Sequence, residues 1–318
     1  MFRRAWQSAM IALARSPRLT RIVQSSRASS FLAAKYVAGV GPSEAVGRAS
    51  ALLSTHGIHS SLFYLGEYVS RLDLVAENVS NKVAVASALQ RTTLDVHVSV
   101  DPTQIGHAID PVLAHQNALK IAEAIELART GRTGFHCLML DMEDASLNDP
   151  TIALHDELRK RGLPVALTLQ AYLRRTESDL SVQINRGNRV RLVKGAFVAD
   201  ASRAFIRQAE IKDNYRHLLE LMFSPRAKES GFYPIVATHD TRLHEFALAV
   251  ARRGGWVQGQ YEFEMLMGVR PDISIALANS GERVRLYVPF GRDWWPYAVR
   301  RIGENPSNAV LLARSVIS

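Results

Sequence analysis

Short apolar runs alternate with longer amphipathic segments from about residue 57 onward. Eight of these runs predict β-strands, at residues 60–65, 95–101, 135–141, 164–170, 189–194, 234–239, 256–263 and 284–289. The segments between them show helical periodicity, for example at residues 67–90, 112–129, 152–161, 201–223 and 243–253. Several of the predicted strands are almost wholly apolar, which is typical of a parallel sheet covered on both faces.

This alternation of strands and helices predicts a fold of the α/β class. Eight such units over about 250 residues favour a (β/α)8 barrel. An open doubly wound sheet is the alternative, but it normally carries a glycine-rich phosphate turn after its first strand. The nearest match, Gly39-Val40-Gly41, precedes the first predicted strand and lacks a third glycine. We therefore predict a helical arm at residues 1–56 and one barrel domain at residues 57–318.

Composition narrows the class of protein further. The chain has 318 residues, of which 47% are hydrophobic and 22% charged, as expected for a globular protein with a sizeable core. A single cysteine, Cys137, excludes an internal disulfide framework and indicates a reducing compartment such as the cytoplasm. No apolar run approaches the roughly 20 residues needed to span a bilayer, which argues against an integral membrane protein.

The net charge of +9 is concentrated at the start of the chain. No acidic residue precedes Glu44, whereas seven basic residues do: Arg3, Arg4, Arg15, Arg18, Arg21, Arg27 and Lys35. Such a segment is compatible with an organelle transit peptide, or with helices that touch an anionic membrane surface or cover the barrel. We favour ordered helices, because the stretch runs without a cleavage-like break into further helical pattern. Nucleic-acid binding is disfavoured, since no aromatic interleaving or groove-reading motif accompanies the basic residues.

Polar side chains follow the predicted strands where each of them ends. In chain order they are Glu67, Asp101, Asp141 with Glu143, Gln170, Lys194, His239 with Asp240, Glu262 with Glu264, and Tyr287. Any one of them is equally well explained as a solvated strand end. Because the carboxyl ends of barrel strands meet at one rim, the whole set predicts a site there. The ten histidines are scattered without metal-ligand spacing, so we predict no metal site.

Two further features carry candidate chemistry. Lys194 precedes the small residues Gly195 and Ala196, which let a flat ring or a phosphate approach the backbone. We rank cofactor contact first for Lys194, a Schiff-base lysine second, and a structural ion pair as the plain alternative. The adjacent Arg300 and Arg301 are suited to gripping a carboxylate, although a solvated pair is the ordinary reading of two neighbouring arginines.

Read together, these segments resemble the flavin-dependent proline dehydrogenase family. The motifs that carry the resemblance occur in the family's order: Tyr64-Leu65-Gly66-Glu67, Pro102-Thr103-Gln104-Ile105-Gly106, Leu140-Asp141-Met142-Glu143, Leu169-Gln170-Ala171-Tyr172, Arg191-Leu192-Val193-Lys194-Gly195-Ala196-Phe197, Ala237-Thr238-His239-Asp240, Phe263-Glu264-Met265-Leu266-Met267-Gly268-Val269-Arg270, and Tyr287-Val288-Pro289-Phe290-Gly291 with Tyr297, Arg300, Arg301 and Glu304. Each motif alone is weak, but eight in order are specific. The match extends through the basic arm to compact bacterial members, which disfavours a transit peptide and a mitochondrial location.

The resemblance implies a distorted (β/α)8 barrel that binds FAD, oxidises L-proline to 1-pyrroline-5-carboxylate and passes the electrons to a quinone. It also implies a cytoplasmic enzyme with peripheral membrane contact. The implied flavin contacts are Met142, Gln170, Arg191, Lys194, Gly195, Ala196, Thr238 and His239. The implied catalytic pair is Asp141 and Arg191. The implied substrate contacts are Asp101, Tyr287, Tyr297, Arg300 and Arg301, with the two arginines holding the carboxylate and Glu304 and Tyr297 fixing them.

One departure from the family pattern bears on the substrate. Asp101 stands where the family has a lysine that helps to neutralise the substrate carboxylate. Exchanging a cation for an anion beside a bound carboxylate reverses an interaction worth about 1–4 kcal/mol. A diverged member that oxidises another imino acid, amino acid or amine is therefore the first alternative. A Schiff-base aldolase using Lys194 and a non-catalytic binding protein are the others. Phe197 in place of the family's common Tyr, and Glu264 in place of Gln, are milder changes.

Overall fold

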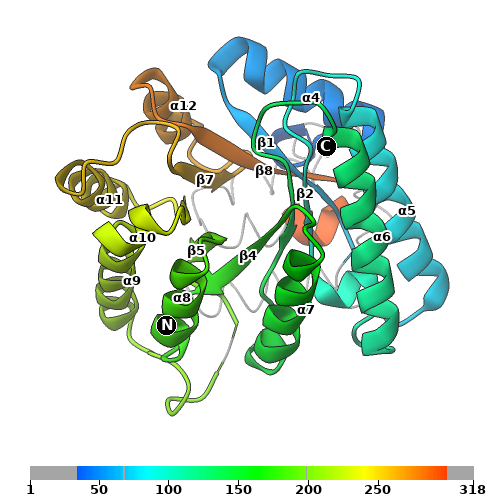
Figure 1. Cartoon of the computed structure of the whole chain (residues 1–318). Helices are drawn as coiled ribbons and strands as arrows, with labels where there is room; N and C mark the ends of the chain where they lie inside the picture. The colour runs from blue at the N-terminus through cyan, green and yellow to red at the C-terminus, as the bar shows by residue number, and fades with distance from the viewer. Residues whose placement is uncertain (1–33, 67–68, 198, 299–318) are drawn as a thin grey trace, which may run out of the picture.

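The computed structural model describes residues 34–66, 69–197 and 199–298 of the chain. Its strands are all parallel to their neighbours and close into a barrel in chain order, with helices around the outside (Figure 1). The strands are β1 His59–Tyr64, β2 His97–Val100, β3 Cys137–Leu140, β4 Val165–Gln170, β5 Arg189–Val193, β6 Tyr233–Ala237, β7 Glu262–Leu266 and β8 Val284–Phe290. The predicted (β/α)8 barrel is confirmed.

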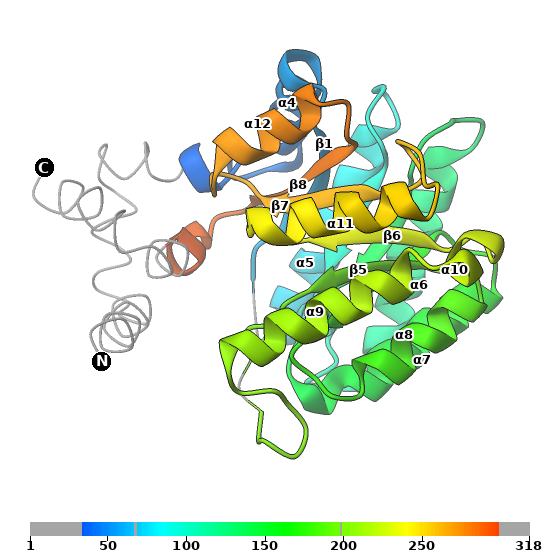
Figure 2. The same ribbon diagram turned by 90° about the vertical axis from the view of Figure 1, so that its left-hand side faces the viewer.

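Most of the described helices connect successive strands, others precede the first strand, and a short helical stretch at residues 294–298 follows β8. The longer ones are α4 Pro42–His56, α5 Leu72–Leu89, α6 Pro111–Arg129, α7 Asn148–Lys160, α8 Thr176–Asn185, α9 Gln208–Met222, α11 Thr241–Arg253 and α12 Pro271–Asn279. Short turns of helix are η1 Pro102–Ile105, η2 Ala145–Leu147 and α10 Pro225–Glu229. Figure 2 shows α8, α9 and α11 packed side by side along the outside of the barrel.

The strands are buried on both faces because they contribute to two separate apolar clusters. Leu138 of β3 belongs to the large core between strands and helices. Its neighbours Cys137 and Met139 belong to a second cluster that includes Ile235 of β6. Since successive side chains of a strand point to opposite faces, the second cluster lies inside the barrel. Burial on both faces explains the continuous apolar runs in the sequence.

Helix α4 belongs to the predicted N-terminal arm. Its first turn is fixed by the Glu44 carboxylate, which accepts hydrogen bonds from the backbone N–H groups of Val40 and Gly41 at 2.8 and 2.9 Å. Gly57 ends the helix with a positive φ of 66°, a conformation that glycine adopts without strain. Residues 1–33 of the predicted arm, with most of its basic side chains, lie outside the described residues.

The prediction for the seventh strand was partly wrong. The sequence predicted a strand at 256–263, whereas β7 runs from Glu262 to Leu266. Trp256 instead packs edge-on against Phe223, with ring centroids 5.4 Å apart, and its indole N–H donates to the Phe223 carbonyl at 2.9 Å. Trp256 is thus a buried aromatic residue in a loop, and its apolar character was mistaken for the beginning of a strand. As a result Glu262 lies at the start of β7, and not at its carboxyl end as predicted.

One helix boundary was also mispredicted. The predicted helix at 201–223 begins only at Gln208, because residues 201–207 form a turn followed by a short extended stretch. Helices α8 and α12 follow β4 and β7, where the alternation of strands and helices predicts a helix without giving its bounds. These errors leave the order of strands, and so the position of the rim, unchanged.

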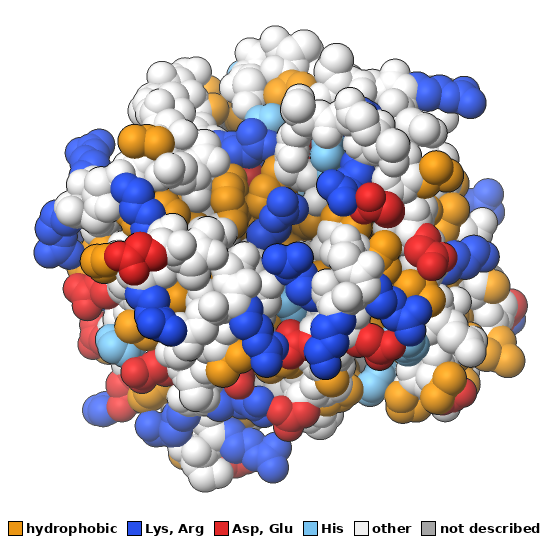
Figure 3. Space-filling model, viewed as in Figure 1, with side chains coloured by type: hydrophobic (Ala, Val, Ile, Leu, Met, Phe, Trp, Pro, Cys, Tyr) orange, Lys and Arg blue, Asp and Glu red, His pale blue; other side chains and the backbone are white. Residues whose placement is uncertain are grey.

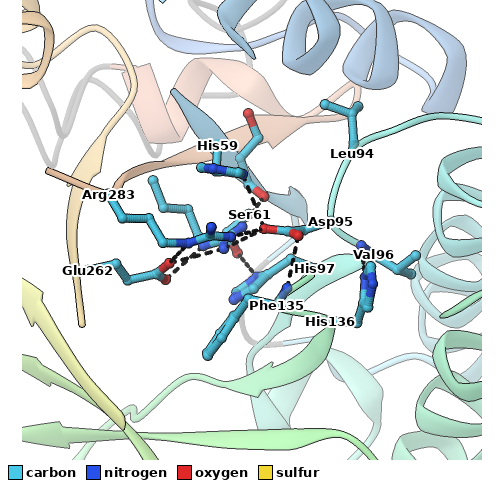
Figure 4. A network of polar contacts seen from close by, with 12 residues as sticks. His59, Ser61, Leu94, Asp95, Val96, His97, Phe135, His136, Glu262 and Arg283 are labelled. Carbon is cyan, nitrogen blue, oxygen red and sulfur yellow. Dashed lines mark hydrogen bonds and ion pairs between the residues drawn. The ribbon is translucent and has the colours of Figure 1, made fainter. Parts of the chain in front are cut away.

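A network of buried charges occupies the amino-terminal part of the barrel (Figure 4). The guanidinium of Arg285, which is fully buried, contacts Glu262 at 2.8 Å and Asp95 at 2.8 Å. Arg283 binds Asp95 at 2.6 Å and Glu262 at 3.1 Å, and His59 lies 3.2 Å from Asp95. Both carboxylates are buried and are shared between two arginines, of which Arg285 is fully buried and Arg283 partly exposed.

The surface of the described part of the chain mixes charges of both signs. On the face drawn in Figure 3, Lys and Arg side chains lie among Asp and Glu side chains rather than in one basic field. Most of the excess positive charge belongs to residues 1–33, outside this part. Among the helices described here, none combines the length and the apolar character needed to cross a membrane.

Candidate active site

The carboxyl ends of the strands line one cavity of about 750 Å³, a volume typical of sites for small molecules. The structure brings together there the twelve predicted site residues that it describes: Asp101, Asp141, Met142, Gln170, Arg191, Lys194, Gly195, Ala196, Thr238, His239, Tyr287 and Tyr297. The functional assignments of these residues stay predictions. Arg300, Arg301, Glu304 and Glu67 lie outside the described residues.

Arg191 of β5 lies at the centre of a buried polar cluster in this cavity. Its guanidinium donates to the Thr168 hydroxyl at 3.0 Å and to the Glu264 carboxylate at 2.8 Å, and it forms a close ion pair with Asp141. The side chain is 4% exposed. Two of these partners lie on other strands and the third, Asp141, directly follows a strand, so the positive charge has one fixed position in the cavity wall.

The two acids around Arg191 differ in their surroundings. Glu264 is 3% exposed, and burial raises the pKa of its carboxyl group, although Arg191 opposes this effect. Asp141 follows β3 and lines the cavity, and its second oxygen accepts a hydrogen bond of 2.8 Å from the Tyr287 hydroxyl. The guanidinium of Arg191 also lies over the Tyr287 ring, 5.6 Å from its centroid. Asp141, Arg191 and Tyr287 thus form one rigid unit at the rim.

Lys194 is held in an ion pair directly after β5, the strand that carries Arg191. Its ammonium group lies 3.0 Å from the Asp240 carboxylate, which Lys212 also contacts at 2.8 Å. Burial opposes ionisation of Asp240, but hydrogen bonds from Lys212 and Lys194 outweigh it and lower the pKa of this carboxyl group well below its usual value. A paired ammonium group is the opposite of the neutral amine that a Schiff base needs, so this geometry argues against an aldolase.

Gln170 presents a hydrogen-bond acceptor to the cavity. Its amide nitrogen donates to the carbonyls of Met142 and Glu143, both at 3.1 Å, and this fixes the orientation of the amide. The amide oxygen is buried and has no donor among the described residues. Since buried polar atoms are normally paired, this oxygen fits an N–H group of a bound molecule, as on the ring of a flavin.

Gly195 brings the backbone close to this region. Its φ is 91°, and a Cβ atom placed on it would lie 2.1 Å from the Tyr172 ring, so a larger residue cannot be accommodated. The Gln170 oxygen as acceptor, the cations of Arg191 and Lys194 and the close backbone at Gly195 therefore suit a planar, hydrogen-bonding cofactor with a phosphate-bearing tail. We conclude that the residues present fit a flavin nucleotide.

Some contributors to this region were not singled out from the sequence. Phe63 and Thr168 line the cavity from strand interiors, where an apolar or β-branched residue is the usual strand-former and gives no separate signal. Lys82 of α5 was also missed, although a signal exists. With Asn78 it falls at helical spacing among Val75, Val79 and Val85, the apolar face of the helix.

A closed parallel barrel whose charged cavity lies at the carboxyl ends of its strands defines the class of protein, a (β/α)8-barrel enzyme. Comparison with known proteins specifies the family. Residues 47–314 match the family model described as Proline dehydrogenase, so the chain belongs to the proline dehydrogenase family and is an oxidoreductase.

Curated relatives agree with this membership. The chain is 30% identical over 323 residues to Proline dehydrogenase of Deinococcus radiodurans, a match that covers 100% of this chain and 99% of the relative. It is 30% identical over 256 residues to Proline dehydrogenase 2 of Bacillus subtilis, covering 80% of this chain and 81% of the relative.

Solved structures support the fold. Proline utilization A from Bdellovibrio bacteriovorus superimposes with a TM-score of 0.77 at 20% identity, over 88% of this chain and 33% of that chain. Proline utilization A from Corynebacterium freiburgense gives a TM-score of 0.72 at 20% identity, over 99% of this chain and 34% of that chain. The chain thus spans about a third of the length of these structures, and the likeness concerns the fold alone.

Proposed function

We propose that this protein oxidises L-proline to 1-pyrroline-5-carboxylate, with FAD as the cofactor and a quinone as the acceptor of the electrons. The observation that carries the proposal is the buried Arg191 guanidinium in the cavity wall. The same cavity is lined by Gln170, whose side-chain oxygen has no donor among the described residues. Membership of the proline dehydrogenase family supports the same reaction.

The reaction removes two electrons and two protons from the substrate: a hydride leaves carbon, and a proton leaves the ring nitrogen. Bound FAD supplies the chemistry of accepting that hydride. With a flavin bound, Arg191 would supply a positive charge that favours hydride transfer, because its guanidinium is fixed in a site of low polarity. Met142, Gln170, Lys194, Gly195, Ala196, Thr238 and His239 hold the cofactor.

Asp141, Tyr287 and Tyr297 contact the substrate side of the cavity. Asp141 and Tyr287 are already oriented by each other and by Arg191, which leaves little rearrangement for substrate binding. Arg300 and Arg301 are proposed as the anchors of the substrate carboxylate. This part of the proposal rests on their residue types and on the sequence motif that contains them.

The test is an absorbance spectrum of the purified protein followed by anaerobic titration with L-proline. We expect the spectrum of an oxidised flavin, and we expect its visible band to bleach as proline is added, whereas D-proline leaves it unchanged. A colourless protein, or a yellow one that no amount of L-proline bleaches, would contradict the proposal.

Tyr287→Phe removes the hydroxyl that binds the Asp141 carboxylate and keeps the ring. Hydrogen bonds to charged groups contribute about 1.5–3 kcal/mol, so we expect kcat/KM for L-proline to fall roughly tenfold or more. Tyr261→Phe is the matched control, because it deletes a hydroxyl that interacts with Glu282 away from the cavity. Equal kinetics in the two variants would remove Tyr287 from the proposed site.

One observation keeps a second substrate class under consideration. Asp101 lines the cavity, where a carboxylate side chain can receive the ammonium group of a substrate other than proline. Steady-state rates with L-proline, hydroxyproline, pipecolate and linear amines separate the two alternatives. Turnover of one of the others without turnover of proline would establish a diverged specificity.

The proposal also places the enzyme in the cytoplasm, in peripheral contact with the membrane that contains the quinone. Flotation of the full-length chain with liposomes that contain anionic lipids tests this contact. Binding that weakens as salt is raised is the expected behaviour of a basic segment on an anionic surface.

A further inference from the structure

Glu264 of β7 is a buried acid in the cavity wall, and the reaction outlined above gives its charge no part. The residue is 3% exposed and belongs to the cavity lining. One carboxylate oxygen, Oε1, accepts a hydrogen bond of 2.8 Å from the Arg191 guanidinium. The other oxygen, Oε2, is buried and has no hydrogen-bond partner among the described residues. Because an ionised carboxylate can only accept hydrogen bonds, a proton bound to Oε2 would disturb no existing contact.

The cation beside Glu264 is shared with a second acid. Arg191 also forms a close ion pair with Asp141, whose other oxygen accepts a hydrogen bond from the Tyr287 hydroxyl. One guanidinium therefore faces two carboxylates, and these three groups carry one excess negative charge when both acids are ionised. An unbalanced charge is costly in a site of low polarity. Both oxygens of Asp141 have a partner and one oxygen of Glu264 has none, so Glu264 is the acid that gains more from a proton.

The neighbouring strands do not remove this imbalance. In the strand pairs, Glu264 lies level with the uncharged Ala237 of β6 and with Arg285 of β8. The Arg285 guanidinium, however, contacts Glu262 and Asp95, at 2.8 Å each. Glu262 is itself a negative charge that disfavours ionisation of Glu264. The nearest other cation is thus committed to other carboxylates.

These surroundings make the protonation of Glu264 sensitive to the charge of a molecule bound in the cavity. Burial raises the pKa of its carboxyl group, whereas Arg191 and Arg285 oppose this effect. A further negative charge nearby favours the protonated form of a carboxyl group still more. A cofactor that accepts a hydride brings such a charge into the cavity, because two electrons arrive with only one proton.

We propose that Glu264 binds one proton when the cofactor in the cavity accepts a hydride, and releases it when the cofactor is reoxidised. The proton binds to Oε2 and converts the carboxylate into a carboxylic acid, so the negative charge gained by the cofactor is balanced by one lost from Glu264. The proton comes from the solution and returns there as the two electrons pass to the acceptor. Glu264 acts through Arg191, so it is a positioning residue. The inference rests on the proposed flavin but not on proline as the substrate.

The test is the pH dependence of the reduction potential of the bound flavin in the unaltered protein and in Glu264→Gln. The amide keeps an acceptor for Arg191 and stays neutral, so it mimics the protonated acid. Each additional proton taken up with two electrons changes the reduction equilibrium tenfold per pH unit, which is about 30 mV per pH unit. We expect the slope of the unaltered protein to be steeper by this amount over part of the range from about pH 5 to about pH 9. The two curves should meet in acid, where Glu264 is protonated in both redox states, and the unaltered protein should have the lower potential in base.

Two further variants separate the carboxyl group from its shape. Glu126→Gln is the matched control, because it removes a carboxylate that is paired with Arg129 and does not line the cavity. Its slope should equal that of the unaltered protein. Glu264→Asp keeps a titratable carboxyl group and should keep the steeper slope. Parallel curves for the unaltered protein and Glu264→Gln would overturn the inference, and so would a Glu264→Asp variant that follows Glu264→Gln. A purely structural Glu264 would alter flavin content and thermal stability without altering the slope.

Infrared difference spectroscopy of the unaltered protein covers the case in which Glu264→Gln does not fold. Reduction of the bound flavin should produce the C=O band of a carboxylic acid, which moves to lower frequency in D2O. A reduced-minus-oxidised spectrum without such a band would refute proton uptake by a carboxylate in this protein.

Failure of the proposed function can be told apart from failure of this inference. Dithionite and redox dyes set the redox state in both measurements, so neither depends on the substrate. A yellow protein that L-proline does not bleach contradicts the proposed function, whereas its potentials still decide the part assigned to Glu264. A protein that stays colourless after addition of FAD contradicts both.

Discussion

Replacing Arg191 by methionine is expected to reduce kcat for L-proline by about 100- to 1,000-fold, the usual effect of removing one fixed charge or donor at a reacting centre. The guanidinium is bound by Thr168, Glu264 and Asp141, which hold its charge in one position. Arg191→Lys should lose nearly as much activity, because one ammonium group cannot reproduce contacts to three partners in a fixed plane. The measurement is single-turnover reduction of the bound flavin by proline.

Loss of stability has to be separated from loss of chemistry in this experiment. Arg191→Met leaves Glu264 and Asp141 without their cation in a buried site. Glu264 already has a raised pKa because of burial, so it will take up a proton rather than stay charged. Combining Arg191→Met with Glu264→Gln should therefore restore thermal stability and flavin content, but not kcat. A double variant that recovers more than about a tenth of the activity would exclude Arg191 as a catalytic residue.

The barrel could be predicted from sequence because one physical requirement repeats eight times. Each strand is covered by helices on one side and by side chains of the barrel interior on the other. Its apolar run therefore stands out in the sequence, as in Val284–Phe290. The rim could be predicted for the same reason, since the residues that follow such runs meet at one end of the barrel. The prediction of a strand at 256–263 was partly wrong because Trp256, an apolar residue in a loop, extended the apolar pattern of the true strand toward the N-terminus.

Which polar side chains bind each other could not be predicted from the sequence. Arg285 and Tyr287 alternate with Val284 and Leu286, which indicates that they point to one face of β8. Nothing in that spacing shows that Arg285 binds Asp95, 190 positions away, while Tyr287 binds Asp141 at the other end of the barrel. Partners of this kind are brought together by closure of the barrel, and closure is a property of all eight strands together.

The buried charges at the amino-terminal end give the second large expected effect, which is on stability. Burial opposes ionisation of Asp95, but contacts with His59, Arg285 and Arg283 outweigh it and lower its pKa far below the usual value. A carboxyl group whose pKa is lower in the folded than in the unfolded protein stabilises the fold above its unfolded pKa, about 3.9. This stabilisation is lost as the pH falls below about 4, toward the lower pKa of the folded state.

Asp95→Asn should destabilise the protein by about 3–5 kcal/mol at neutral pH, because it leaves the buried Arg285 and the partly exposed Arg283 with half of their counter-charge. The isosteric amide still accepts the Phe135 N–H bond, so the loss is chiefly electrostatic. The melting temperature should fall by roughly 5–8 °C. Asp213→Asn, at an exposed carboxylate paired with Arg216, is the matched control and should have little effect.

The pH dependence distinguishes this account from simple loss of packing. Denaturant unfolding between pH 3 and pH 7 should show a steep loss of stability below about pH 4 in the unaltered protein and a shallower one in Asp95→Asn, so the two curves converge in acid. Because the network lies at the opposite end of the barrel from the cavity, kcat per bound flavin should remain unchanged wherever the variant is folded. Parallel curves across this range would mean that the charge of Asp95 contributes nothing to the fold. The arginines would then be held by Glu262 and by backbone carbonyls such as that of Ser60.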